Sequence, residues 1–355
     1  MKTYLRGHVI TRDDVWEALS AWSSGESGRK NSHRILEEYG SDGALVDEIY
    51  AEVRGRNLTF RPIRRYRRTE PVNGKVRVIG ISSIKQQVCD YLVCTLLKPL
   101  FDAKIGFYQV ACVKGKGQGL CRTALRKWVR DSKYHVKLDI RQCYPSMSHD
   151  VVMRMYRRYV GSEDVLYVIE SILGTYSRGL EIGSYFSMMT MQLVISFIYH
   201  HVEGLHKTRR GRRVRLFGHQ IWHMDDALLT GDDKRDLRAV ARAVERFAAM
   251  LGLSIKPWKV ARTSDVEPLD LGGWVVRRDR VTMREGTFLR GTRAFARFGK
   301  MPNEGNARRC VSYWGWFVNG DNETALARRG IPRTFARARR LISRHTVGTI
   351  GKATP

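Results

Sequence analysis

Three aspartates stand where apolar stretches end or are interrupted. Asp139 follows the apolar run in 134–140, and Asp225 and Asp226 are adjacent within the stretch 219–230. Neighbouring carboxylates in an apolar setting repel one another unless a cation neutralises them. Hard oxygen ligands suit magnesium, and two ions about 4 Å apart can bind both the attacking and the leaving oxygen of an in-line displacement. The aspartates therefore predict a two-magnesium site for phosphoryl transfer, with Mn²⁺ able to substitute; the alternative is an ordinary hairpin turn at Asp225 and Asp226.

The charge balance indicates a polyanionic partner. The chain has 355 residues, with 63 Lys and Arg against 35 Asp and Glu and a formal net charge of +28. Such an excess favours nucleic acid over an anionic membrane surface. No run of about 18 apolar residues predicts a membrane span, and the N-terminus has no apolar leader segment. With six scattered cysteines read as reduced thiols, we expect a cytoplasmic protein with no membrane contact.

The basic residues flank the carboxylates along the chain. The stretches 52–78 and 277–355 are strongly basic, and the cluster 207–215 predicts a basic hairpin around Gly211. Apolar spacing predicts a mixed helix-and-strand protein. The expected strands cover 75–81, 134–140 and 219–230, and the expected helices cover 11–22, 42–54, 84–101 (ending near Pro99), 235–251, 305–319 and 333–344.

Further motifs accompany the aspartates in a fixed order. They lie in 74–79, 111–117, 179–187, 251–259 and 271–274. With Met224-Asp225-Asp226 as its most specific part, this ordered set resembles the prokaryotic reverse transcriptases of group II introns, diversity-generating retroelements and phage-defence systems, over about residues 55–320. The resemblance implies an α+β right-hand polymerase fold of fingers, palm and thumb, with an antiparallel palm sheet backed by helices and a helical thumb. The implied divisions are an N-terminal helical extension (1–55), fingers with part of the palm (56–134), a palm with motifs A to E (135–280) and a basic thumb (281–355).

The resemblance also implies roles around the metals. Asp139 and Asp225 would bind both magnesium ions, Asp226 would assist, and the backbone carbonyl of Ile140 would be a further ligand. Tyr144 would lie under the incoming sugar and exclude a 2′-hydroxyl group, which selects deoxynucleotides.

Other residues are expected to bind the nucleotide. Lys75 and Arg77 lie on alternate positions of the expected strand and therefore on one face, where they would neutralise the triphosphate. Gly183 and Ser184 belong to a glycine-rich turn that lets backbone approach the template base and nucleotide. This turn departs from the family at Glu181, where proline is usual, and at Met188, where glutamine is usual; Gln192, one helical turn later, is the candidate substitute.

Lys259 is the expected general acid toward the departing pyrophosphate, with Lys256 as its competitor. Residues 84–87 depart from the Asp-Arg pair that is usual in relatives, and we expect this to change local contacts without loss of activity.

Nucleic-acid contacts are expected from five residues: Lys114, Lys116, Gly272, Arg337 and Arg340.

The resemblance implies an RNA-directed DNA polymerase that extends a primer with dNTPs on an RNA template. The expected partners are a structured non-coding template RNA, the DNA primer and product, and a small accessory protein. Length and the Met-Asp-Asp motif favour a diversity-generating retroelement, whereas the departures in 179–188 favour a phage-defence system. Two alternatives stay open: a nucleic-acid-binding protein with an inactive polymerase site, and protein-primed or template-free DNA synthesis on the same scaffold.

Overall fold

A four-stranded antiparallel sheet carries the three aspartates. The computed structural model describes residues 2–70 and 74–350, without the side chains of 345–350. The strand order is β6–β7–β3–β8, and the strands are β3 (Tyr134–Asp139), β6 (His219–His223), β7 (Asp226–Gly231) and β8 (Val260–Arg262). The strands expected over 134–140 and 219–230 are therefore confirmed, the second as two strands joined by a turn.

Both faces of this sheet are covered. Ala227 and Leu229 of β7 pack into one apolar core with the helices α10 (Tyr185–Glu203) and α11 (Lys234–Met250). Leu228, which points to the other face, packs into a second core with α7 (Gln118–Asp131). A central strand buried on both faces has no alternation of polar and apolar residues, which explains the continuous apolar run after Asp226.

The N-terminal helices join the same core as the sheet. Helix α1 (Arg12–Ser24) packs on α5 (Ile84–Leu96) and begins with Thr11 and Asp14 in a reciprocal capping box. The expected helices over 11–22 and 42–54 are confirmed. Their bounds and those of the neighbouring helices are α2 (Glu26–Asn31), α3 (His33–Tyr39), α4 (Asp42–Arg54), α8 (His149–Tyr159) and α9 (Glu163–Gly174).

The prediction of one helix over 84–101 is wrong. Helix α5 ends at Leu96, and a second helix, α6 (Lys98–Lys104), begins directly afterwards. Pro99 lies in the first turn of α6. Because the N–H groups of a first turn have no helical partner, proline is tolerated there. Pro99 therefore starts a helix instead of ending one.

Two hairpins extend from this body. Strands β1 (Arg64–Thr69) and β2 (Val76–Ile81) form one antiparallel hairpin, and residues 71–73 between them lie outside the described residues. Strands β4 (His206–Arg209) and β5 (Arg212–Arg215) form the other, which confirms the basic hairpin expected around Gly211.

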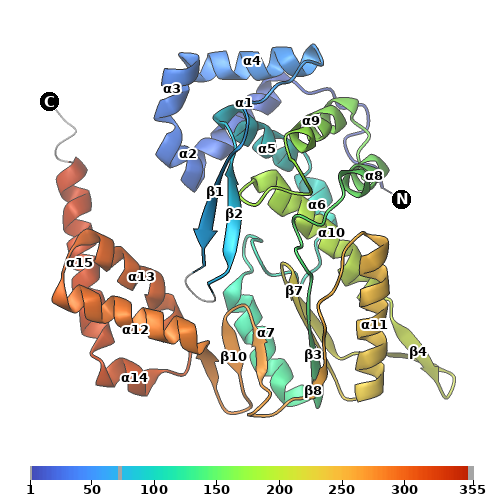
Figure 1. Cartoon of the computed structure of the whole chain (residues 1–355), viewed down its shortest axis with the longest axis vertical. Coiled ribbons are helices and arrows are strands. Elements are labelled where there is room, and N and C mark those ends of the chain that lie inside the picture. The colour runs from blue at the N-terminus through green and yellow to red at the C-terminus, as the bar shows by residue number, and fades with distance from the viewer. Residues whose placement is uncertain (1, 71–73, 351–355) are drawn as a thin grey trace.

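The C-terminal part is a small sheet followed by helices, which lie at the lower left of Figure 1, below the N-terminal helices. The sheet has the order β11–β10–β9. The expected helices over 235–251, 305–319 and 333–344 are confirmed. The remaining bounds are β9 (Leu269–Leu271), β10 (Trp274–Val276), β11 (Val281–Met283), α12 (Glu285–Lys300), α13 (Glu304–Val318), α14 (Glu323–Arg328) and α15 (Ile331–Ile350); residues 351–355 of the expected thumb lie outside the described residues.

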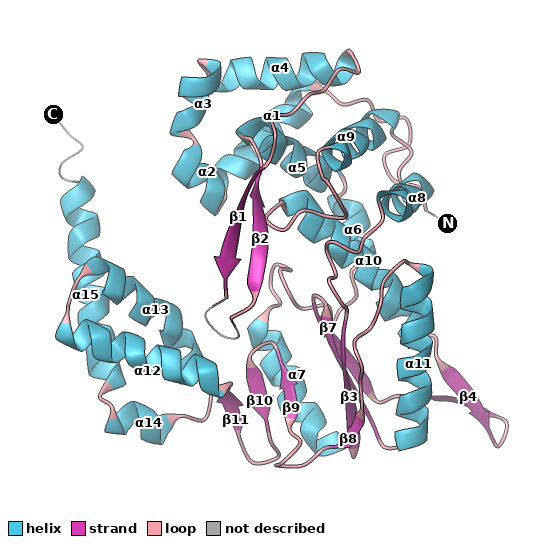
Figure 2. Cartoon of the chain, in the orientation of Figure 1, coloured by secondary structure: helices cyan, strands magenta, loops and turns pink. Residues whose placement is uncertain are grey.

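Helices and antiparallel sheets are thus mixed as the α+β prediction requires (Figure 2). No helix in the described part of the chain has the length and apolar content needed to cross a membrane.

Candidate active site

The sheet register brings the three aspartates together. Asp139, the last residue of β3, lies directly opposite Asp226, the first residue of β7. Asp225 precedes it in the turn, and its backbone carbonyl accepts a hydrogen bond of 3.0 Å from the amide of Ile140. Met224 adopts a φ of 57°, a conformation that favours glycine. Strain of this kind persists where the surroundings fix the backbone, and it often marks a functional site.

Burial and mutual repulsion raise the pKa of two of these carboxyls. Burial raises the pKa of Asp225, and the charge of Asp139 adds to this effect, while Arg77 and Lys256 oppose it. Burial also raises the pKa of Asp226 to about 6, with Lys137 opposing and the other two aspartates adding to the rise. Because these surroundings disfavour the ionised carboxylates, a bound cation would stabilise them.

Two lysines lie beside the aspartates. The Nζ atom of Lys256 is 2.6 Å from Oδ1 of Asp139. The two groups form an ion pair, but their angles do not meet those of a hydrogen bond. Lys137 Nζ is 3.8 Å from Oδ2 of Asp226. Lys256 is held in this position because its amide donates to the Asp139 carbonyl over 2.8 Å.

The structure gives Lys259, the expected general acid, different surroundings from Lys256. Lys259 lines the same cavity of about 370 Å³ as Lys256 and Asp139, but its Nζ atom lies 2.6 Å from Oε1 of Glu267 and its side chain is 77% exposed. Of the two competing lysines, Lys256 is the one in contact with an aspartate.

The oxygen donors at this end of the sheet suit a hard cation, although the three carboxylates do not converge on one point. Among the described residues, no three Asp, Glu, His or Cys side chains converge as a complete metal site. Asp139, Asp225 and Asp226 offer carboxylate oxygens, the ligands that magnesium prefers. The buried backbone of Ile140 continues directly from Asp139 and bridges Ile255. The Lys256 ammonium group supplies the positive charge beside Asp139.

Tyr144 lines a second cavity next to the aspartates. This cavity of about 590 Å³ includes Met224, the neighbour of Asp225, on its wall. Burial raises the pKa of the Tyr144 hydroxyl, so the ring stays neutral. Other lining residues come from β2 and from the turn before α10, and they include Ile79, Gly80, Gly183, Ser184 and Met188. Tyr144, Gly183 and Ser184 thus line the same cavity.

Gly183 permits a close approach of two backbones. Its φ is 116°, and a Cβ atom there would lie 2.5 Å from the Gly80 carbonyl oxygen. The Gly80 amide donates to the Ile182 carbonyl over 2.8 Å. This contact joins β2 to the turn, so any side chain at Gly183 would push the two segments apart.

Ser184 uses its hydroxyl within the protein. The Oγ atom caps α10 by accepting from the Ser187 amide, and it donates to Oδ2 of Asp90 over 2.7 Å. Asp90 is buried, and burial raises its pKa to about 7. Ser184 therefore holds the shape of the turn as well as lining the cavity. Asp90 was not foreseen, although an acidic residue among the buried positions of an apolar helix is a recognisable signal.

Glu181, which stands where proline is usual, anchors the β1–β2 hairpin. Its Oε2 atom accepts from Nε and Nη2 of Arg65 over 3.0 and 2.7 Å. Arg65 lies directly opposite Gly80, and the Glu181 side chain occupies the space that a Cβ at Gly80 would fill. The hairpin is thus fixed at its base by an ion pair that sequence patterns did not reveal.

The suggestion that Gln192 replaces the usual glutamine is wrong. Gln192 is buried and donates to the Ala111 carbonyl, while its Oε1 accepts from Gln109 over 3.1 Å. Its amide is therefore committed to the core, whereas Met188 lines the Tyr144 cavity.

The two expected triphosphate ligands lie on or next to β2. Arg77 pairs with Glu70 across the hairpin, and its charge opposes the rise in the pKa of Asp225. Lys75 lies just before the strand, and its carbonyl accepts from the Glu70 amide over 2.8 Å. Arg77 is therefore within electrostatic reach of the aspartates.

The loop 111–117, which carries Lys114 and Lys116, borders the Tyr144 cavity through Cys112. Nζ of Lys116 donates to the Gly106 carbonyl over 2.9 Å, which turns it inward. Lys114 lines a cavity of about 590 Å³ with Lys98 and Tyr185. Tyr185 also lines the Tyr144 cavity, so this loop borders the same side of the molecule.

Gly272 packs beside the aspartate turn. It forms the β9–β10 turn with Gly273, at φ values of 60° and 88°. A Cβ at Gly272 would lie 3.3 Å from the ring of His223, the residue before Met224. The turn thus borders the end of the sheet that carries Asp225.

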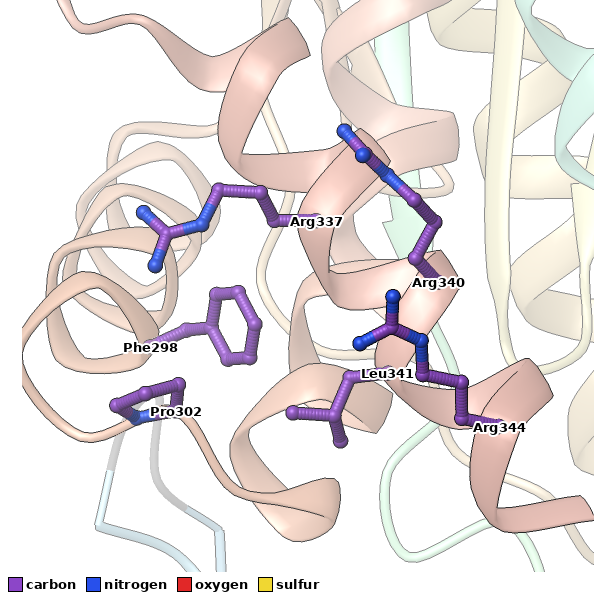
Figure 3. A pocket seen from close by; sticks show the side chains of 6 residues that line it. All are labelled: Phe298, Pro302, Arg337, Arg340, Leu341 and Arg344. Atoms are coloured by element: carbon purple, nitrogen blue, oxygen red, sulfur yellow. The ribbon is translucent and has the colours of Figure 1, made fainter.

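Arg337 and Arg340 are not at the aspartates. They extend from α15 over a cavity of about 350 Å³ whose other walls are Phe298, Pro302, Leu341 and Arg344 (Figure 3). Their spacing puts them on one face of the helix, as a basic surface of the C-terminal helices.

The sequence profile of the reverse transcriptase (RNA-dependent DNA polymerase) family matches residues 67–292. The chain belongs to the reverse transcriptase family. The matched region contains the aspartates, Tyr144, Lys256 and the β9–β10 turn, and this family consists of nucleotidyltransferases.

One curated relative is the COX1/OXI3 intron 1 protein of Saccharomyces cerevisiae. It is 20% identical over 173 residues, which cover 45% of this reverse transcriptase chain. The match covers 20% of the yeast protein, so the chain spans a small part of that relative's length.

Proposed function

We propose that the protein is an RNA-directed DNA polymerase that extends a primer with dNTPs on an RNA template. The observation that carries this proposal is the pairing of Asp139 with Asp226 at the sheet end, with Asp225 in the adjoining turn. Tyr144 and Met224 share the neighbouring cavity, which has the volume for a nucleotide. Family membership supports the same reaction.

We assign the metal ligands to Asp139, Asp225, Asp226 and the carbonyl of Ile140. Two magnesium ions, with manganese as a substitute, would neutralise the attacking 3′-oxygen and the leaving pyrophosphate. The raised pKa values of Asp225 and Asp226 support this assignment, because a nearby cation would offset the burial and the mutual repulsion that raise them.

Positive side chains would act on the triphosphate. Arg77 and Lys75 of the β1–β2 hairpin would bind phosphate oxygens, and Lys256 would give a proton to the departing pyrophosphate. Lys256 is favoured over Lys259 by its 2.6 Å contact with Asp139. When the triphosphate binds, the Lys256 ammonium would exchange the carboxylate for a phosphate oxygen.

Sugar selection would come from the ring of Tyr144. A partly buried ring packed against the core would leave no space for the extra oxygen of a ribonucleotide. The turn at Gly183 and Ser184 would support the base pair from the other side of the cavity.

Fingers, palm and thumb would then correspond to 56–134, 135–280 and 281–355, with 1–55 as an extension. Lys114, Lys116 and Gly272 would contact template and primer, and Arg337 and Arg340 would contact duplex phosphates. The inward contact of Lys116 leaves Lys114 as the stronger phosphate ligand of that loop.

We further propose that the enzyme belongs to a retroelement or an anti-phage defence system, copies a structured non-coding RNA and works with a small accessory protein. The intron-protein name of the yeast relative supports the retroelement setting. Sequencing of the RNA that copurifies with the protein tests this point, and an absence of any enriched structured RNA would contradict it.

Primer extension with magnesium and dNTPs tests the activity itself. We expect extension on an RNA template by the native chain and none by Asp225→Asn, while the exposed Asp265→Asn serves as a matched control with native activity. Extension that survives Asp225→Asn would overturn the metal assignment. Tight RNA binding without extension on any template would identify a binding protein instead.

A further inference from the structure

The β4–β5 hairpin is a concentrated cationic projection that lies outside the proposed polymerase site. Residues 206–215 contain six Lys and Arg side chains and no acidic one. All four β5 residues and the β4 residues nearest the turn are exposed. In Figure 1 the hairpin extends from the body beside α11, on the opposite side from the helices α12 to α15.

Acidic residues of the body fix the base of this hairpin. Lys207 pairs with Asp236 at the start of α11, and Arg215 pairs with Glu203 at the end of α10. These two ion pairs come from different strands and different helices. The hairpin therefore has a defined orientation at its base.

The outer part of the hairpin has cations without acidic partners. Arg209 lies directly opposite Arg212 in the strand register, and Arg210 and Gly211 form the turn between them. Within the described residues, none of these three arginines has an ion-pair partner. Like charges directly opposite one another destabilise a strand pair, so a bound polyanion would relieve a repulsion that is built into the fold.

The hairpin is distant from the polymerase site. Helix α10 has 19 residues, which span about 28 Å at 1.5 Å per residue. Its first residue adjoins Ser184 in the Tyr144 cavity, and its last residue, Glu203, holds the hairpin. The hairpin also precedes His219, at the end of β6 remote from the aspartate turn.

We propose that this hairpin binds the phosphate backbone of a double-stranded segment of the RNA substrate, outside the polymerase groove. This inference rests on the proposed function for the identity of the RNA. Arginine side chains match phosphate geometry, and double-stranded RNA is bound mainly through its shape, phosphates and 2′-hydroxyls.

The composition of the hairpin argues against other partners. Residues 206–215 contain no Phe, Tyr or Trp, so they offer no platform for stacking the bases of a single strand. Val214 is the one large apolar side chain, whereas the centre of a protein interface is depleted in charge and enriched in aromatic residues.

The test compares two RNAs in binding assays without dNTPs. One is a minimal RNA template with a short DNA primer, and the other carries an additional RNA stem beyond the template. We expect the Arg209→Ala, Arg210→Ala, Arg212→Ala triple variant to bind the stem-bearing RNA about 10-fold or more weakly, with a salt slope reduced by up to about three. Binding and extension of the minimal template should stay within about twofold of native.

A matched variant with lysine at the same three positions separates charge from folding. It should keep most of the affinity, because each point charge is retained. Equal weakening on both RNAs, no weakening on either, or equal weakening with a DNA stem of the same sequence would overturn the proposal. Because binding is measured without nucleotide, a failure of polymerase activity does not alter this readout.

Discussion

Asp139 lies directly opposite Asp226 at the end of the β3–β7 strand pair. Directly opposed residues of an antiparallel pair have Cβ atoms about 4.5–5.5 Å apart, and like charges there oppose folding. The pair is therefore a cost to the metal-free protein and an advantage once a cation binds. Removal of one carboxylate should therefore stabilise the metal-free protein and weaken its binding of a metal ion.

We predict that Asp226→Asn stabilises the metal-free protein. Burial raises the pKa of Asp226 from an ordinary value of 3.8 to about 6, so the folded state binds the proton more tightly than the unfolded state. Ionisation of Asp226 therefore lowers the free energy of unfolding. This loss is absent below pH 3.8, grows between pH 3.8 and 6 and is complete above pH 6. Its upper limit is about 3 kcal/mol.

Denaturant unfolding in EDTA at pH 7.5 and pH 4 measures this effect. The gain should appear at pH 7.5 and nearly vanish at pH 4, while the exposed Asp265→Asn should show little change at either pH. A loss of stability at pH 7.5 would mean that Asp226 makes a favourable contact that outweighs its burial.

Lys256→Ala should slow nucleotide incorporation by about 100-fold, the lower range for loss of a general acid. Lys259→Ala should stay within about twofold, because its ammonium is engaged with Glu267. Single-turnover kinetics with one correct dNTP measure the chemical step. The opposite ranking of the two variants would restore Lys259 as the acid.

Tyr144→Ala should admit ribonucleotides, because removal of the ring opens space beside the 2′ carbon. Tyr144→Phe should keep the native selectivity, since it retains the ring and removes only the hydroxyl. Competition between dCTP and CTP in primer extension measures the preference. An unchanged preference in Tyr144→Ala would assign sugar selection to another residue.

Arg65→Ala should destabilise the protein more than Glu181→Gln. The first change leaves the buried Glu181 carboxylate without its cation, at a cost of about 1–3 kcal/mol. The second removes the charge that needs neutralising. Denaturant unfolding of the two single variants and the double variant measures the coupling, and additive effects would show that the ion pair does not join the hairpin to the body.

The sequence predicted those elements whose signals are local. Helix α11 begins at a capping aspartate, Asp233, and keeps one apolar face, and the aspartates stand where their strands end or begin. Strand β1 escaped prediction because its six residues are all exposed and four are arginine, so no alternation exists.

Other parts of the site depend on contacts between distant segments. The ion pair between Arg65 and Glu181 joins two residues that are far apart in the chain and share no sequence motif. The choice between Lys256 and Lys259 was open in the sequence, because both follow the same apolar segment. The bridge between Ile140 and Ile255 brings the adjacent Lys256 to Asp139, a contact between strand ends that the sequence did not reveal.

The close approach of Gly80 and Gly183 has a consequence for how this protein can vary. A methyl group on Gly183 would meet the Gly80 carbonyl, and one on Gly80 would meet the Glu181 side chain. Gly183 is therefore the less tolerant position, because the obstacle there is backbone and its φ of 116° disfavours any side chain. The Glu181 side chain can move to admit a methyl group at Gly80, at the cost of its contacts with Arg65. In a library of single substitutions, Gly183 should be replaced less often than Gly80. The residue at position 181 thus sets how much variation position 80 can accept.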